Sequence, residues 1–207
     1  MWHERLNEFV TLFVVINPFG VLTSFVATTG GLTRPVQNRI AALAVLVSFF
    51  VLAFLEVAGG FLLEQMGISL RAFQIAGGVV LFLIALEMVR GEHHAPPKRA
   101  TAAEKVKALA IYPIAIPKIA SPGAMLAVVV VGDDDRFNFV QLSLTTAVLA
   151  VVMVITLCFL LAAPFISRFI GETGASVISR VLGLVLAALA ITTILNAFGD
   201  WLSLPKL

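Results

Sequence analysis

Six long apolar stretches limit what this chain can fold into more than any other feature. Each is close to the roughly 20 residues that an α-helix needs to cross a bilayer. They cover 6–29, 39–63, 72–90, 109–131, 139–166 and 176–198. Charged residues make up only 13% of the 207 positions, whereas a soluble domain carries about 25%. The sequence therefore predicts an all-α integral membrane protein with six transmembrane helices and little mass outside the lipid.

Two of these stretches, the first and the fourth, are interrupted by a proline near their middle. The first contains Asn17-Pro18-Phe19-Gly20, and the fourth contains Ser121-Pro122-Gly123-Ala124, 104 positions later. In both, a residue that favours the N-cap precedes a proline at the first helical position, which is how a new helix starts. Counted from the expected span starts, each interruption lies about 17 Å deep, near the bilayer midplane. We therefore predict a new half-helix at each of them.

The same 104-residue offset relates other parts of the chain. It aligns Gly67 with Gly171, just before the third and sixth stretches, and stripes of small residues follow both. Two copies of a three-span unit account for this, and because three is odd the second copy must insert upside down. We expect one membrane domain, 1–207, with two inverted-topology repeats, 1–90 and 109–207, joined by a cytoplasmic linker, 91–108.

Lysines and arginines are distributed unequally between the two sides of the predicted membrane. Nine lie on the side of the linker, and four lie on the side that holds both termini. The positive-inside rule then places both termini on the non-cytoplasmic side of a bacterial-type inner membrane. A net charge of only +2 is too small and dispersed to indicate a nucleic-acid surface. The lipid bilayer is the expected surrounding, and the sequence leaves the oligomeric state undetermined.

The two interruptions carry the predicted chemistry. Inverted repeats make the two half-helices run apart from the centre, so their N-termini can converge on one cavity. Helix N-termini carry about half a positive charge and free N–H groups, which favour a carboxylate. Gly20 and Gly123 would let a ligand approach the backbone, and Phe19 could form an apolar wall or face lipid. Taken singly each proline is explained by a packing kink, but a matched pair is typical of a transporter binding site.

Three ionisable residues inside apolar stretches, Lys118, Glu56 and Glu87, are candidates for ion or proton coupling. Lys118, about 14 Å deep and one turn before Ser121, could pair with a carboxylate, carry a proton, or extend along a polar cavity. Glu56 is expected close to the outer surface, and Glu87 beside Arg90 near the cytoplasmic end; either could bind a coupling proton if buried. The coupling ion, H⁺ or Na⁺, stays open, and no metal or organic cofactor is expected.

The fourth stretch also contains Pro113 and Pro117, spaced by four residues. Together with Pro122 they predict the most irregular helix of the six. This helix is the first candidate for the element that moves.

Three motifs of the chain resemble those of the MarC family of six-span membrane proteins. They are Ile16-Asn17-Pro18-Phe19-Gly20, Gly67–Leu70 followed by Ala72–Gly78, and Ala120-Ser121-Pro122-Gly123-Ala124. The resemblance covers nearly the whole chain. It implies an inner-membrane transporter of small neutral amino acids such as glycine or alanine, with its site at the interrupted first and fourth helices. Ser121 stands where the family element has glycine, and Lys118 where an apolar residue is expected.

Other functions are weighed beside amino acid transport. Export of drugs or larger metabolites would need a wide, aromatic-lined cavity. An intramembrane hydrolase would need Ser121 as nucleophile with Lys118 as its base, because no histidine lies in a predicted span. A non-transporting membrane partner would leave the two interruptions without a purpose. The chain has no GxxxxGK[ST] phosphate loop, and we expect no catalytic residue.

Overall fold

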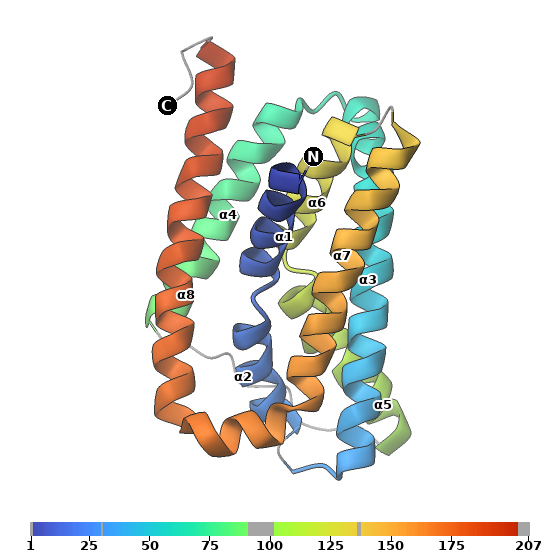
Figure 1. The fold of residues 1–207 in the computed structure, drawn as a ribbon, viewed down its shortest axis with the longest axis vertical. Coiled ribbons are helices and arrows are strands. Elements are labelled where there is room, and N and C mark those ends of the chain that lie inside the picture. The colour runs from blue at the N-terminus through green and yellow to red at the C-terminus, as the bar shows by residue number, and fades with distance from the viewer. Residues whose placement is uncertain (1, 30, 91–101, 136–137, 203–207) are drawn as a thin grey trace.

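The fold is a bundle of helices with no strand in the described part of the chain. The computed structural model describes residues 2–29, 31–90, 102–135 and 138–202. The helical elements are α1 (Trp2–Ile16), α2 (Pro18–Thr29), α3 (Arg34–Gln65), α4 (Leu70–Arg90), α5 (Ala102–Leu109), η1 (Ala110–Ile119), α6 (Pro122–Asp135), α7 (Phe139–Leu161) and α8 (Ala163–Leu202). Helix α1 begins and α8 ends toward the same end of the bundle (Figure 1), which we call the terminal end.

Several helices are long and apolar enough to cross a bilayer. Among the described residues these are Glu4–Val26, Arg34–Gln65, Leu70–Arg90 and Phe139–Leu161. A pair bent by 60°, Val106–Ile119 with Pro122–Gly132, makes a fifth span if counted as one unit. The sixth predicted span falls in α8, where the apolar helix Gly183–Gly199 is shorter. Four to five spans are therefore evident by length and composition, and the arrangement as six stays a prediction.

The first interruption separates α1 from α2 at a single residue. Asn17 has a φ of +52°, the left-handed region that asparagine enters more readily than other residues with a Cβ. Pro18 is the first residue of α2, where its missing N–H costs nothing. A separate helix therefore begins at this proline, although Glu4–Val26 as a whole is long and apolar enough to count as one span.

The fourth stretch is irregular before it breaks. Within η1, Tyr112 (φ −129°, ψ 126°) and Ile116 (φ −124°, ψ 122°) are extended. Each directly precedes a proline, whose ring disfavours helical geometry in the residue before it. The helix resumes as α6 at Pro122. The fourth stretch is therefore irregular before α6 begins at its third proline.

Glycines allow close helix crossings around this framework. A Cβ on Gly132 of α6 would overlap the backbone oxygen of Glu56 in α3. Helix α4 meets α8 at two such points: a Cβ on Gly78 would lie 2.6 Å from Ile194, and one on Gly183 would lie 3.1 Å from the Ala85 oxygen. Packing at small residues drives helix association in lipid. Gly78 and Gly183 of the predicted small-residue stripes lie at this interface, whereas a Cβ on Gly77 would meet Leu126 of α6.

Corresponding helices of the two halves of the chain run in opposite directions. In Figure 1, α2 runs from the first break away from the terminal end, whereas α6 runs from the second break toward it. Helices α3 and α7 run in opposite directions, as do α4 and α8. The fully buried side chains include Ile16, Ile119 and Ala124, so part of the core surrounds the two breaks.

Two predicted boundaries need correction. Helix α7 ends at Leu161, five residues before the predicted end of the fifth span. The next helix begins at Ala163 with Pro164 in its first turn, the position that proline favours. The predicted linker, 91–108, overlaps all but the last residue of the helix α5, whereas residues 91–101 lie outside the described part of the structure.

Candidate functional site

The first break is built by the Asn17 side chain. Its Oδ1 accepts a hydrogen bond from the Gly20 amide at 3.1 Å, which caps α2 as predicted. Its Nδ2 donates to the Met88 sulfur of α4 at 3.4 Å. A thioether is a weak acceptor, so the Asn17 Nδ2 group could donate instead to a stronger oxygen acceptor of a ligand. Asn17 is 8% exposed and therefore lies inside the bundle.

The second break repeats this arrangement with a serine. Ser121 Oγ accepts from the Ala124 amide at 3.1 Å, and the Ser121 carbonyl accepts from the Met125 amide at 2.8 Å. Ser121 is 7% exposed. The corresponding carbonyl bond at the first break runs from the Val21 amide to Asn17 at 3.1 Å. The two breaks thus share the same pattern of capping hydrogen bonds, although their capping residues differ and only Asn17 has a positive φ.

The caps change what the helix ends offer to a ligand. We expected uncapped amides, but the third helical residue, Gly20 or Ala124, already donates to its cap. Proline at the first helical position has no N–H. The amide of the second residue, Phe19 or Gly123, lies outside these capping bonds. Each half-helix therefore presents one amide at its start, with the positive end of the helix dipole behind it.

The two breaks lie next to each other in the bundle. A Cβ on Gly123 would overlap Leu81 of α4 and lie 3.3 Å from Val15, two residues before Asn17. The first turn of α6 therefore packs on the last turn of α1 and on α4. Because Leu81 and Met88 both belong to α4, that helix lines both breaks. Sequence reasoning missed these two residues, since an apolar side chain on a membrane helix carries no signal of what it contacts.

The remaining residues of the two motifs differ in their exposure. Pro18 and Ala124 are buried, whereas Pro122 is exposed, so one side of the α6 N-terminus is open. Phe19 is half-buried and packs edge-on against Phe159 of α7, with ring centroids 4.7 Å apart. Phe19 therefore joins α2 to α7, rather than only facing lipid.

The three ionisable candidates do not gather at the breaks. Lys118 is half-buried in η1, three residues before Ser121. Glu56 is 2% exposed, and Thr146 of α7 donates to its Oε1 at 2.9 Å. Glu87 is exposed near the end of α4. Of the two carboxylates, only Glu56 therefore meets the burial that a proton-carrying role requires.

A serine nucleophile is not supported by this geometry. The Ser121 hydroxyl oxygen accepts from Ala124, so its contact in the described structure is that of a helix cap. Among the described residues, no group of three or more histidine, cysteine, aspartate or glutamate side chains could hold a metal ion.

Comparison with known proteins places this architecture in a family. The model of the MarC family integral membrane proteins matches residues 2–202, almost the whole chain. The chain belongs to the MarC family. The resemblance seen in the sequence motifs is thereby confirmed, and the protein is an integral, multi-pass membrane protein.

Relatives of this MarC protein occur in distant organisms. It is 30% identical over 195 residues to a UPF0056 membrane protein of Archaeoglobus fulgidus, covering 93% of this chain and 91% of the relative. It is 32% identical over 201 residues to the UPF0056 membrane protein YvbG of Bacillus subtilis, covering 92% of each. It is 30% identical over 199 residues to YhcE of Escherichia coli, covering 91% and 88%. These names state a membrane protein and no enzymatic activity. No solved structure matches the chain.

Proposed function

We propose that this MarC protein is a secondary transporter of small neutral amino acids that alternates access around the two helix breaks. The observation that supports this proposal is the pair of adjacent half-helix starts, one in each half of the chain. At each start, one backbone amide takes no part in the capping hydrogen bonds. A carboxylate has two oxygens, and one could accept from Phe19 N–H while the other accepts from Gly123 N–H. Both interactions benefit from the helix dipoles, at about 0.3–1 kcal/mol each, or up to about 2 when partly buried.

The substrate is proposed to be small because the backbone is closely packed at the breaks. Gly123 lies directly against Leu81 and Val15, which are both buried. A large aromatic drug would need these side chains to move apart, whereas the side chain of glycine or alanine would need little space. The observed packing thus favours a small amino acid over the drug-export alternative.

Movement is proposed to centre on η1 and α6. The extended residues Tyr112 and Ile116 remove regular helix hydrogen bonds from η1. A 60° bend separates it from α6, so the two segments are proposed to move separately. Lys118 lies on this segment and is proposed to respond to the substrate carboxylate or to carry a proton. Of the two predicted carboxylates, the buried Glu56 is the stronger candidate for the coupling ion, H⁺ or Na⁺, because Glu87 is exposed. We also propose that both termini lie on the non-cytoplasmic side.

Uptake into proteoliposomes tests the function. Purified protein should take up or exchange labelled glycine and alanine, and a sodium or pH gradient applied separately should identify the coupling ion. Protein-free liposomes provide the background. If neither amino acid is taken up or exchanged under any gradient, the proposed function is wrong.

The site is tested by removing the second cap. Ser121→Ala should weaken amino acid binding while leaving membrane insertion intact. Ser69→Ala is a matched control, because Ser69 Oγ accepts from the Ala72 amide at 3.2 Å in an exposed cap of α4, away from the breaks. Equal loss of binding in the two variants, or no loss in either, would remove Ser121 from the substrate site.

A further inference from the structure

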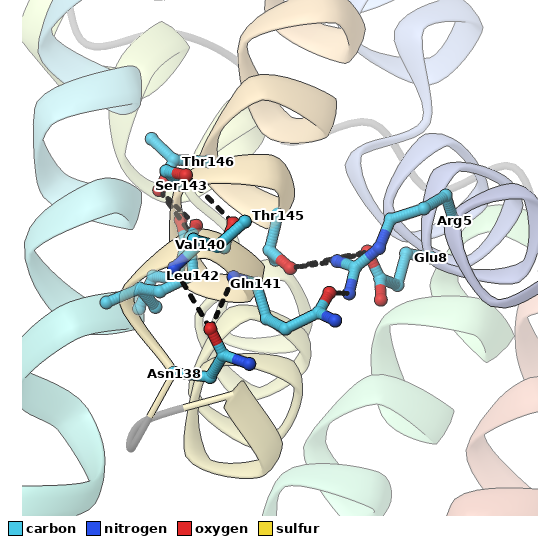
Figure 2. Close-up of polar contacts among 10 residues, drawn as sticks. Arg5, Glu8, Asn138, Val140, Gln141, Leu142, Ser143, Thr145 and Thr146 are labelled. Carbon is cyan, nitrogen blue, oxygen red and sulfur yellow. Dashed lines mark hydrogen bonds and ion pairs between the residues drawn. The ribbon is translucent and has the colours of Figure 1, made fainter. Parts of the chain in front are cut away.

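A polar cluster joins α1 to α7 at the terminal end of the bundle. Arg5 donates through Nη1 to Glu8 Oε2 at 2.7 Å and to Thr145 Oγ1, and through Nη2 to Gln141 Oε1. Thr145 Oγ1 also lies 3.4 Å from Glu8 Oε2. Figure 2 shows the two α1 side chains pointing at the α7 side chains across the gap between these helices. We call Arg5, Glu8, Gln141 and Thr145 the Arg5 cluster.

The chemistry of the Arg5 cluster makes it a strong but reversible connection. The guanidinium uses both terminal nitrogens, and bonds from a charged donor are about twice as strong as neutral ones. The Arg5 and Glu8 side chains are only 18% and 14% exposed, so water competes weakly for these bonds. Thr145 is 1% exposed. If the helices separated, water entering from the terminal end could solvate all four groups.

The contact on the other side of the first break is different in kind. On the side of Asn17 away from the terminal end, α2 meets α7 through the Phe19–Phe159 ring pair. Among the described residues, no side-chain hydrogen bond like those of Arg5 joins these two helices. Asn17 interrupts the helix between the two contacts, so α1 and α2 need not move as one rod. The two ends of the first span are therefore held to the same helix by separable contacts, one polar and one aromatic.

We propose that the Arg5 cluster is the gate at the terminal end, whose release lets α1 pivot at Asn17 and opens the breaks to that side. The gate rests on the proposed transport function, because it regulates access to the same site. Its position fits this role. Helix α1 packs on α6 as well as α7, and Val15 at its inner end covers Gly123. Moving α1 away from α7 would therefore uncover the start of α6.

Cysteine accessibility tests the gate without measuring transport. Val15→Cys reports on the terminal side of Asn17, and Val21→Cys reports on the other side; both valines are buried. The native Cys158 is first replaced by serine, since it is the only cysteine and is exposed. Right-side-out and inside-out vesicles are then treated with a membrane-impermeant methanethiosulfonate reagent.

Arg5→Gln should raise labelling of Val15→Cys about tenfold from the terminal side, as expected when a charge-assisted bond network is lost. Labelling of Val21→Cys from the opposite side should not rise. Arg71→Gln removes an exposed charge near the same end and should change neither rate. The double variant Gln141→Leu with Thr145→Val, which keeps both charges, should reproduce the effect, and adding Arg5→Gln to it should give little more.

Each result decides the proposal. Unchanged Val15→Cys labelling in Arg5→Gln overturns the gate, even if the protein transports amino acids. An equal rise at Val15→Cys and Val21→Cys overturns it too, because that indicates general loosening of the bundle. A selective rise at Val15→Cys supports the gate even where glycine and alanine are not transported, in which case the proposed amino acid transport is wrong and the gate controls access for another solute.

Discussion

Substituting Asn17 should separate the backbone role of this residue from its role at the site. Asn17 does two things in the structure: it adopts a φ of +52° and its side chain caps α2. Alanine removes the cap, at about 1 kcal/mol, and must also adopt left-handed geometry, at roughly 1–2 kcal/mol. Glycine adopts that geometry freely and costs only a few tenths of a kcal/mol as a cap, roughly. Asn17→Ala should therefore lower the free energy of unfolding by about 2–3 kcal/mol, and Asn17→Gly should lower it much less.

Thermal unfolding of the detergent-purified protein measures this difference. For a chain of this size, about 1 kcal/mol shifts Tm by roughly 2–4 °C. Asn17→Ala should thus lower Tm by about 4–12 °C and Asn17→Gly by roughly 1 °C. Asn138→Ala is the matched control for an asparagine cap, since Asn138 caps α7 with an extended backbone, φ −125°. Asn138→Ala should lose only the contribution of the helix cap to stability, about 1 kcal/mol.

Binding of labelled glycine should follow a different order from stability. Both Asn17 variants lack the side-chain amide, so both should bind more weakly to a similar extent, although only the alanine variant is markedly destabilised. Equal Tm losses for alanine and glycine would refute the backbone argument. Parental affinity in the stable glycine variant would show that the Asn17 side chain does not contact the substrate.

Three further substitutions test the packing that holds the site. Gly132→Ala would place a methyl group against the Glu56 carbonyl oxygen and should cost about 1–3 kcal/mol in detergent unfolding, whereas Gly199→Ala, with nothing within 4 Å, should be neutral or stabilising. A similar loss in both would mean that the α3–α6 crossing is wrong. Leu81→Ala should cost about 2–5 kcal/mol, because this side chain is 2% exposed and would leave a cavity; an unchanged Tm would contradict its burial. The main effect of Gly123→Ala should be weaker glycine uptake, with a smaller loss of thermal stability, since the methyl group would press on Leu81 beside the Gly123 amide. Uptake equal to the parent would contradict a site at this amide.

Local residue chemistry explains why the two breaks were predictable. Asparagine or serine before proline both caps a helix and ends the preceding one, and these effects act within a few residues. The same holds for η1, where two prolines force the preceding Tyr112 and Ile116 to be extended. Long apolar stretches likewise predict membrane helices, because backbone polar groups in lipid must bond within their own segment.

Other features of the site were not predictable from local chemistry. Arg5 and Gln141 are 136 positions apart, and nothing in either segment indicates that they bond. Position along its helix placed Glu56 close to the outer membrane surface, but it did not show that α6 and α7 cover this side chain, which is 2% exposed. The reason is that distance along a helix axis says nothing about which neighbours surround the side chain.

The sequence by itself determined which stretches of this MarC protein are membrane helices, which two of them contain a break, and that lipid surrounds them. These properties depend on proline geometry, capping and apolar length, which act over a few residues at a time. Only the tertiary structure decided that Gly123 meets Val15 and Leu81, and that Arg5 links α1 to α7. Helix neighbours in lipid are selected by close packing and a few long-range polar bonds, and these depend on the shapes of both partners at once.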